Sequence, residues 1–206
     1  MRWLFLPPSP SDFIRLLKAW RFWILASLLG AVLGAVFYAV SPPPYRARAT
    51  VNVDFNLELA WPEETDRQQF YYLEREVRKL EEIAWSDAVI GLVAQRANID
   101  VPELRTGVLM LSQPAEAGWH FYADDPSPEK AALMATTWAN AFVEQTRIAV
   151  GAQSGYSSFI QLEATQVTDI PVNRSVPQGA YLLSGSAVCL VLSLILYLFI
   201  RPGQVR

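Results

Sequence analysis

The side chains that most often carry enzyme chemistry are scarce in this chain of 206 residues. His120 is the only histidine, and it lies in the segment WHFYA with no cysteine nearby to complete a metal site. A serine nucleophile would need His120 as its base, but no GxSxG motif precedes it. No glycine-rich phosphate-binding loop is present either. We therefore interpret His120 as a residue on the face of a sheet.

Two adjacent carboxylate pairs, Glu63-Glu64 and Asp124-Asp125, are the remaining candidates for acid–base chemistry. Neighbouring carboxylates at a turn more often cap a helix or interact with its dipole. We expect Asp124 or Ser127 to cap the long helix that follows them. The sequence therefore predicts a protein that is not an enzyme and that holds no metal or cofactor.

Hydrophobic residues, 52% of the chain, are concentrated in two runs near its ends. Residues 22–40 and residues 179–200 contain no charged side chain. As helices, both runs are long enough to cross the hydrocarbon core of a bilayer, which takes about 20 residues. We predict two transmembrane helices. A signal peptide is the alternative for the first run, but the run is long for one and prolines follow it at 42–44.

Basic residues flank the outer ends of both predicted spans, at Arg2, Arg15, Lys18, Arg21, Arg201 and Arg206. Because such residues favour the cytoplasmic side, residues 1–21 and 201–206 are expected on the cytoplasmic side of the membrane. Within 1–21, apolar residues at helical spacing predict an amphipathic helix in the membrane interface, or alternatively an extension of the first span.

The central segment, 41–178, is then expected outside the cytoplasm. It has 19 acidic and 11 basic residues, which argues against a nucleic-acid partner. The only cysteine, Cys189, lies in the second span, so the central segment has no disulfide.

Between the spans, the hydrophobic pattern alternates between strand and helix periodicity. YRARATVNVDF places Ala47, Ala49 and Val51 on one face of a strand, and charged residues such as Glu74 and Arg78 lie on the solvated face of a helix. The segment is therefore predicted to be one α+β domain. Its predicted elements are a strand over 45–55, a helix over 70–84, a shorter helix capped by Ser86, a hairpin over 104–111 and 119–123, a long helix over 128–150 ended by Gly151 and Gly155, and a strand over 159–167.

Small residues and prolines mark two further features. Gly30 and Gly34 form a small-xxx-small stripe that predicts close helix packing, although glycine is common in such helices. Pro171 and Pro177 precede the second span; they either hold the chain in an extended approach to it or simply punctuate a loop.

The order of these segments resembles the Wzz family of polysaccharide co-polymerases, or chain-length determinant proteins. The stretches that carry the resemblance are SDFIRLLKAWRFWIL, YRARATVNV, IAWSDAVIGLVAQRANI, DDPSPEKAALMATTWANAFVEQ and PVNRSVPQGAYLL. Larger members extend the long helix into an outward hairpin, so this chain resembles the compact form.

The resemblance implies a non-catalytic membrane scaffold that forms a homo-oligomer and regulates the chain length or export of a surface polysaccharide, such as O-antigen, capsule or exopolysaccharide. Its partners would be copies of itself, a polysaccharide polymerase or undecaprenyl-linked glycan, and membrane lipid. One alternative is an adaptor that activates a separate tyrosine kinase, although the tail RPGQVR is short. Another is an accessory subunit of an unrelated membrane complex.

Four arginines are candidates for contacts with lipid phosphates or an acidic glycan. Salt bridges to neighbouring protomers would explain them equally well. These residues are Arg46, Arg48, Arg67 and Arg174.

Overall fold

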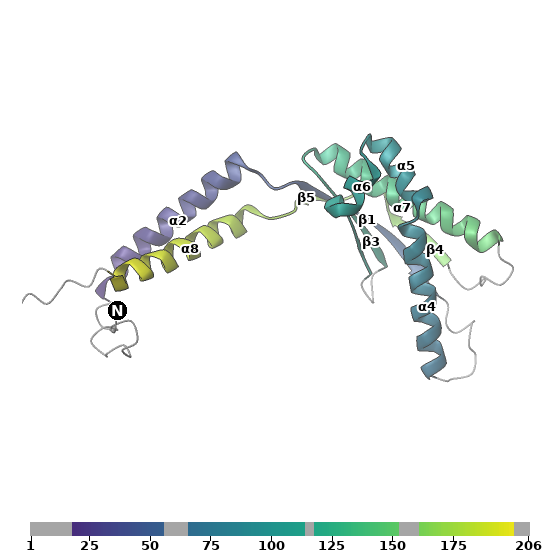
Figure 1. Cartoon of the computed structure of the whole chain (residues 1–206), viewed down its shortest axis with the longest axis horizontal. Helices are drawn as coiled ribbons and strands as arrows, with labels where there is room; N and C mark the ends of the chain where they lie inside the picture. Colours follow the sequence, from purple (N-terminus) through teal and green to yellow (C-terminus); the bar gives the residue numbers. More distant parts are fainter. Residues whose placement is uncertain (1–17, 56–65, 114–117, 153–160, 200–206) are drawn as a thin grey trace, which may run out of the picture. The chain divides into compact units, whose positions relative to one another are not determined.

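The computed structural model describes residues 18–55, 66–113, 118–152 and 161–199 (Figure 1). The chain forms two compact units. The first contains the helices near the two ends of the chain, and the second is the mixed helix and sheet domain of Pro44–Ser175.

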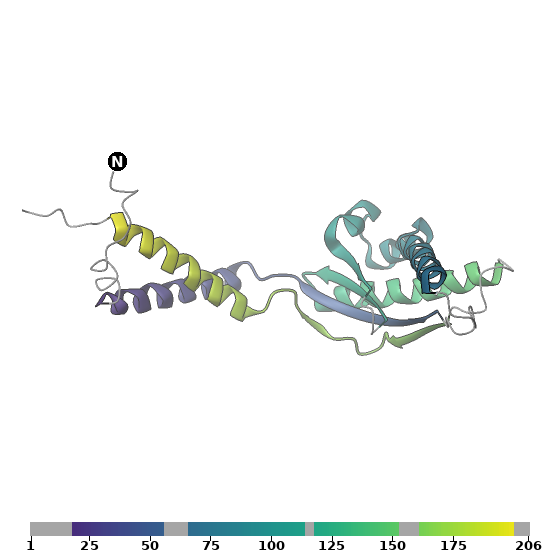
Figure 2. The same cartoon turned by 90° about the horizontal axis from the view of Figure 1, so that it is seen from below.

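Two apolar helices make up the described part of the first unit, α2 (Trp20–Val40) and α8 (Gln178–Phe199). Both are long and apolar enough to cross a membrane. They lie side by side in both views (Figures 1 and 2). Most of their large hydrophobic side chains remain exposed, including Leu25 at 65% and Leu183 at 73%. Such a surface is stable in lipid and unfavourable in water.

The second unit is built on one antiparallel sheet with the strand order β2-β3-β1-β4, in which β5 also pairs with β1. β1 is long enough to hold two partners on one edge, because a bulge after Thr50 shifts its register to β4 and its first residues pair with β5. The strands are β1 (Tyr45–Asp54), β2 (Leu109–Ser112), β3 (Trp119–Asp125), β4 (Gln161–Gln166) and β5 (Val172–Arg174).

The helices of this unit gather on one side of the sheet (Figure 2). The long helix α7 runs against β1 and β3, and α5 packs on α7. Small side chains at Ala47 and Ala49 of β1 are fully buried and let α7 approach the sheet closely. The helices are α4 (Asp66–Ala84), α5 (Asp87–Ala97), α6 (Val101–Glu103), the π-helical turn η2 (Leu104–Val108) and α7 (Pro128–Ala152).

An aromatic cluster forms the centre of the core between α7 and the sheet. The ring of Trp138 lies edge-on to Phe121, 5.0 Å between centroids, and Phe142 stacks on Trp119 at 5.4 Å. The indole N–H of Trp138 donates a 2.8 Å hydrogen bond to the carbonyl of Ala84 at the end of α4. This bond satisfies a carbonyl that the helix itself leaves open.

Several predicted local features are present. The strand face of Ala47, Ala49 and Val51 is buried. Ser86 caps α5 by accepting a 3.4 Å hydrogen bond from the backbone of Val89. The pair Glu74–Arg78 forms an exposed salt bridge of 2.7 Å.

The prediction of a strand over 104–111 is wrong for its first half. Pro102 lies in the first turn of α6, and the chain continues as a helical turn through Leu104–Val108. Gly107 then adopts φ 136°, a conformation that favours glycine, and only Leu109–Ser112 pair with β3. The long helix extends to Ala152, so Gly151 lies within it, and Gly155 lies outside the described residues.

Candidate functional site

The side of the sheet opposite the helices carries polar and aromatic side chains from the two central strands. Alternation along β1 and β3 turns these residues away from α7. They form three directly opposed cross-strand pairs, and we call these six residues the open face. The pairs are Arg46 with Asp124, Arg48 with Tyr122, and Thr50 with His120.

The first pair is a closed ion pair. Arg46 donates from Nε and Nη2 to the two carboxylate oxygens of Asp124, at 2.7 and 2.6 Å. This hydrogen bonding raises the pKa of the Arg46 guanidinium, against the opposing effect of burial. The guanidinium also lies 5.9 Å from the centre of the Tyr122 ring. Arg46 is therefore neutralised within the chain.

Asp124 consequently does not cap the long helix. Ser127 takes that role, since its hydroxyl accepts a 3.3 Å hydrogen bond from the backbone of Lys130. Asp124 and Ser127 were both predicted as the cap, and Asp124 is unavailable because its carboxylate is bonded to Arg46. The sequence offered no signal for this pairing, because it depends on the register of β1 against β3.

The second arginine of the open face is in a different state. The Nε of Arg48 is buried and has no hydrogen-bond partner. No carboxylate in the described parts of the chain forms a salt bridge with Arg48. Its direct cross-strand neighbour is Tyr122, and Asp124 in the next row is already paired with Arg46. The charge of the Arg48 guanidinium is therefore not balanced by either residue.

His120 completes the centre of the open face. It shares a 3.1 Å hydrogen bond with the hydroxyl of Thr50 through Nδ1. Burial lowers the pKa of His120, and the charge of Arg48 lowers it further. Both effects favour the neutral form of the imidazole, and its ring lies edge-on to Tyr122 at 6.1 Å. This position matches the expectation of a histidine on a sheet face.

The other two candidate arginines lie elsewhere. The guanidinium of Arg174 stacks over the ring of Tyr45, 3.7 Å from its centre. By alternation along β1, Tyr45 lies on the face of the sheet opposite to Arg46 and Arg48. Arg67 lies in α4, and its side chain is outside the described residues. The structure therefore gathers Arg46 and Arg48 on one face and does not bring Arg174 to it.

The two singled-out prolines flank the short strand β5. The carbonyl of Pro171 accepts a 3.3 Å hydrogen bond from the backbone of Arg48. At the other end, Pro177 directly precedes α8, and its carbonyl accepts a 3.0 Å bond from Ala180. Proline is tolerated at both places because neither needs its missing N–H.

Gly30 and Gly34 lie in the contact between α2 and α8. A Cβ added at Gly30 would lie 2.8 Å from the Cβ of Cys189, and one added at Gly34 would lie 2.9 Å from the carbonyl carbon of Tyr181. Gly185 of α8 faces them, and the hydroxyl of Ser186 donates to the carbonyl of Ser27 at 3.1 Å. The stripe therefore packs against the second helix of the same chain. Gly185 was not singled out, although its small size was a visible signal.

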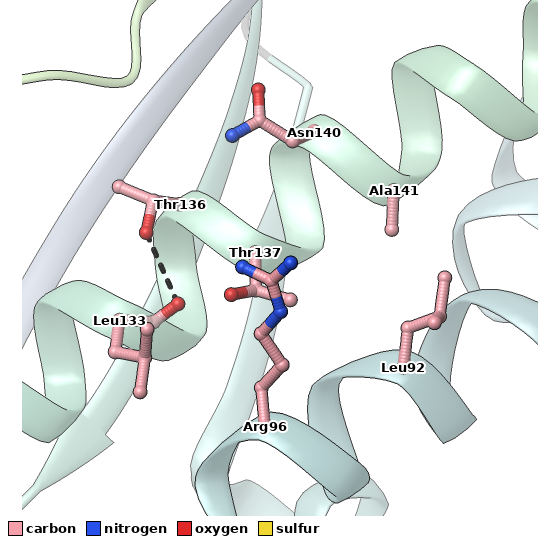
Figure 3. A pocket seen from close by; sticks show the side chains of 7 residues that line it. All are labelled: Leu92, Arg96, Leu133, Thr136, Thr137, Asn140 and Ala141. Atoms are coloured by element: carbon pink, nitrogen blue, oxygen red, sulfur yellow. Dashed lines mark hydrogen bonds between the residues drawn. The ribbon is translucent and has the colours of Figure 1, made fainter.

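A shallow hollow of about 320 Å³ lies between α5 and α7 (Figure 3). Arg96 extends from α5 toward Thr137 on α7, and Asn140 lies beyond it. Leu92 and Leu133 on its rim are 43% and 39% exposed. The hydroxyl of Thr136 is already bonded to its own helix, at 2.8 Å to Ala132. Arg96 thus provides a cation in contact with water.

No family model matches the chain, and no curated protein matches it significantly. In the described parts of the chain, no three His, Cys, Asp or Glu side chains are grouped so as to hold a metal ion. What the open face offers chemically is a neutral imidazole, a hydroxyl, an aromatic ring and an unbalanced guanidinium. These groups can bind an anion through charge-assisted hydrogen bonds.

Proposed function

We propose that this chain is a compact Wzz-like protein of a bacterial inner membrane. In this proposal it is a non-catalytic oligomeric scaffold that regulates the chain length or export of a surface polysaccharide. The helices α2 and α8 cross the membrane, both termini are cytoplasmic, and the α+β domain is extracytoplasmic.

The observation that supports this proposal is how the domain is connected to the two apolar helices. β1 follows α2, β5 precedes α8, and these two strands pair with each other. The backbone N–H of Ser175 also donates a 2.9 Å hydrogen bond to the carbonyl of Pro44. The domain is therefore closed at the place where the chain enters and leaves it. A folded module held at both ends suits a protein that acts by position.

The proposed orientation is supported by the distribution of charge. The segments outside the two apolar runs at the chain ends contain six of the 17 basic residues and only one acidic residue, Asp12. Such an excess of Lys and Arg favours retention in the cytoplasm.

The proposed action is geometric. Several copies, packed through their outer domains, would present a common surface to a polymerase or to undecaprenyl-linked glycan, and the number of copies would set how much glycan is held while it grows. Each copy then contributes binding and spacing, and another protein makes the glycosidic bonds.

The test is a deletion in a strain that makes a surface polysaccharide. We expect the size distribution of the glycan on a gel, or the amount exported, to change on deletion and to return when the intact chain is restored. A distribution and yield that are unchanged on deletion contradict the proposal. Copurification of a tyrosine kinase whose phosphorylation needs this chain would instead support an adaptor.

The mass of the purified chain in detergent tests the scaffold separately. We expect a complex of several copies. A strict monomer at the protein concentration of the membrane would contradict the oligomeric mechanism even if the glycan phenotype is present.

A further inference from the structure

Three arginines of the sheet, Arg46, Arg48 and Arg174, differ in how available they are to a ligand. Arg46 is held by two short hydrogen bonds to Asp124, and Arg174 stacks on Tyr45. Arg48 alone among these three has a buried donor atom without a partner. It lies in the middle row of the sheet, where no described helix covers it.

An unbonded buried donor on a charged group is unfavourable, and an acceptor that reaches it regains that free energy. The strong partners of a guanidinium are carboxylates and phosphates, which it can meet with two parallel hydrogen bonds. The hydroxyl of Thr50 and the imidazole of His120 lie in the next row and add polar hydrogen-bonding groups beside Arg48. The site is therefore suited to an anion.

The single charge of Arg48 favours an anion with a single negative charge. Asp124, the carboxylate one row away, is already paired with Arg46. A doubly charged phosphate would leave one negative charge unbalanced beside Arg48, whereas a carboxylate would not. Beside Arg48, the ring of Tyr122 offers a flat apolar surface with a polar tip, which suits a sugar ring.

We propose that the open face binds an acidic sugar of a glycan chain, with Arg48 receiving the sugar carboxylate and Tyr122 packing against the sugar ring. This inference deepens the proposed function and rests on it, since it names the glycan class that the domain would hold. Arg48 is thereby a binding residue, and Arg46 and Asp124 position the strand around it.

The pKa of His120 can be used to detect binding at this site, because His120 is the only histidine in the chain. Its titration can be followed by the NMR signal of ¹³C-labelled imidazole in the intact chain, purified in a zwitterionic detergent through a tag without histidine. The charged and titratable groups of the open face around it are Arg46, Arg48, Tyr122 and Asp124, and of these Arg48 lowers the pKa of His120. A carboxylate bound to Arg48 would offset the cation that lowers the pKa of His120, so ligand should raise that pKa.

The probe is tetragalacturonate, compared with the neutral maltotetraose and with inorganic phosphate. We expect tetragalacturonate to raise the pKa of His120 and to bind in a saturable manner, and the other two to do so at least about tenfold more weakly. Arg48→Gln should raise the pKa of His120 without ligand and abolish the response to tetragalacturonate. Arg48→Lys keeps the charge but not the paired hydrogen bonds, so it should bind more weakly than the wild type.

The matched control is Arg96→Gln, which removes a cation from the hollow between α5 and α7 and leaves the open face intact. It should bind tetragalacturonate as the wild type does. Equal binding by wild type and Arg48→Gln, with helical content retained, overturns the proposal. If Arg48→Gln does not fold, equal binding by wild type and Arg48→Lys overturns it.

Two other outcomes also overturn it. Tighter binding of phosphate than of tetragalacturonate would assign the site to phosphorylated ligands, and absence of saturable binding by any probe would remove the site. Either result leaves the deletion phenotype unaffected, so failure of this inference is distinguishable from failure of the proposed function.

Discussion

Arg46 and Arg48 show how strongly the cross-strand neighbour determines the state of a side chain. They are two residues apart on one face of one strand, yet Arg46 meets Asp124 and Arg48 meets Tyr122. The guanidinium of Arg46 is paired and that of Arg48 is not, although both arginines lie in the same local sequence, YRARA, and each is followed by alanine. Any function of the face therefore depends on strand register.

His120 should make the stability of the domain depend on pH. Its pKa is lowered in the folded state by burial and by Arg48, whereas the unfolded chain titrates near the ordinary value of about 6.5. Below that value the unfolded state binds the proton more readily. The contribution is therefore fully present above the unfolded pKa and is lost as pH falls toward the folded pKa.

The measurement is urea unfolding of the intact chain in nonionic detergent, followed by tryptophan fluorescence between pH 5 and 8. The difference in unfolding free energy between wild type and His120→Gln should shrink or reverse toward low pH. Parallel pH profiles for the two proteins would contradict this prediction.

The ion pair of Arg46 and Asp124 should contribute measurably to stability. Asp124 is 16% exposed and the contact uses two hydrogen bonds, so Asp124→Asn should cost about 1 kcal/mol. A double-mutant cycle with Arg46→Gln isolates the pair. The matched control is Glu74→Gln with Arg78→Gln, because that pair is 49% and 72% exposed and should contribute only a few tenths of a kcal/mol. Equal coupling energies in both cycles would be evidence against the prediction.

At the scale of elements, the bond between Trp138 and Ala84 joins α7 to the end of α4. Trp138→Phe removes the indole donor and leaves the Ala84 carbonyl buried without that partner. We expect the free energy of unfolding to fall by about 2 kcal/mol, from the lost hydrogen bond and the smaller ring. Trp85→Phe is the control, since no comparable bond from Trp85 joins these helices in the described residues. A smaller loss for Trp138→Phe than for Trp85→Phe would count against this account.

The contact between α2 and α8 should be sensitive to single methyl groups. Gly30→Ala and Gly185→Ala would each place a Cβ against the backbone of the facing helix, whereas Gly179→Ala meets nothing within 4 Å. We expect the first two to destabilise the helix pair by about 1–3 kcal/mol and the third to have little effect. Unfolding of the helices by SDS titration, followed by circular dichroism, measures this. Equal midpoints for all three variants would show that the glycines do not determine the packing.

The sequence predicted the elements whose pattern is local. The alternation around Ala47 and Ala49, the cap at Ser86 and the salt bridge between Glu74 and Arg78 each follow from neighbours a few residues apart. It could not predict β5, because three residues after a proline carry no periodicity and pair only with a distant strand. The helical turn at 104–108 was missed because its apolar spacing also fits a strand. The candidate site was predicted in part. Arg46 and Arg48 were recognised as candidate binding residues, but the ion pair of Arg46 with Asp124, which distinguishes the two, was not predicted.

At the scale of the whole molecule, the proposal makes a direct prediction about which side of the membrane the domain occupies. In a Cys189→Ser background, a cysteine at Ser112, which is exposed on β2, should react with a membrane-impermeant maleimide in spheroplasts. A cysteine at position 206 should react only after lysis. Labelling of the second site alone in intact spheroplasts would place the domain in the cytoplasm and overturn the proposed topology.

The 2.9 Å hydrogen bond between Ser175 and Pro44 has a consequence for evolution and engineering. Because the first and last residues of the domain touch, residues 44–175 form a cassette with adjacent ends. Such a cassette can be exchanged for another of the same end spacing without lengthening either connection. Under the proposed function, selection could vary the outer domain while α2 and α8 stay unchanged, and a chimera made at these two residues should fold.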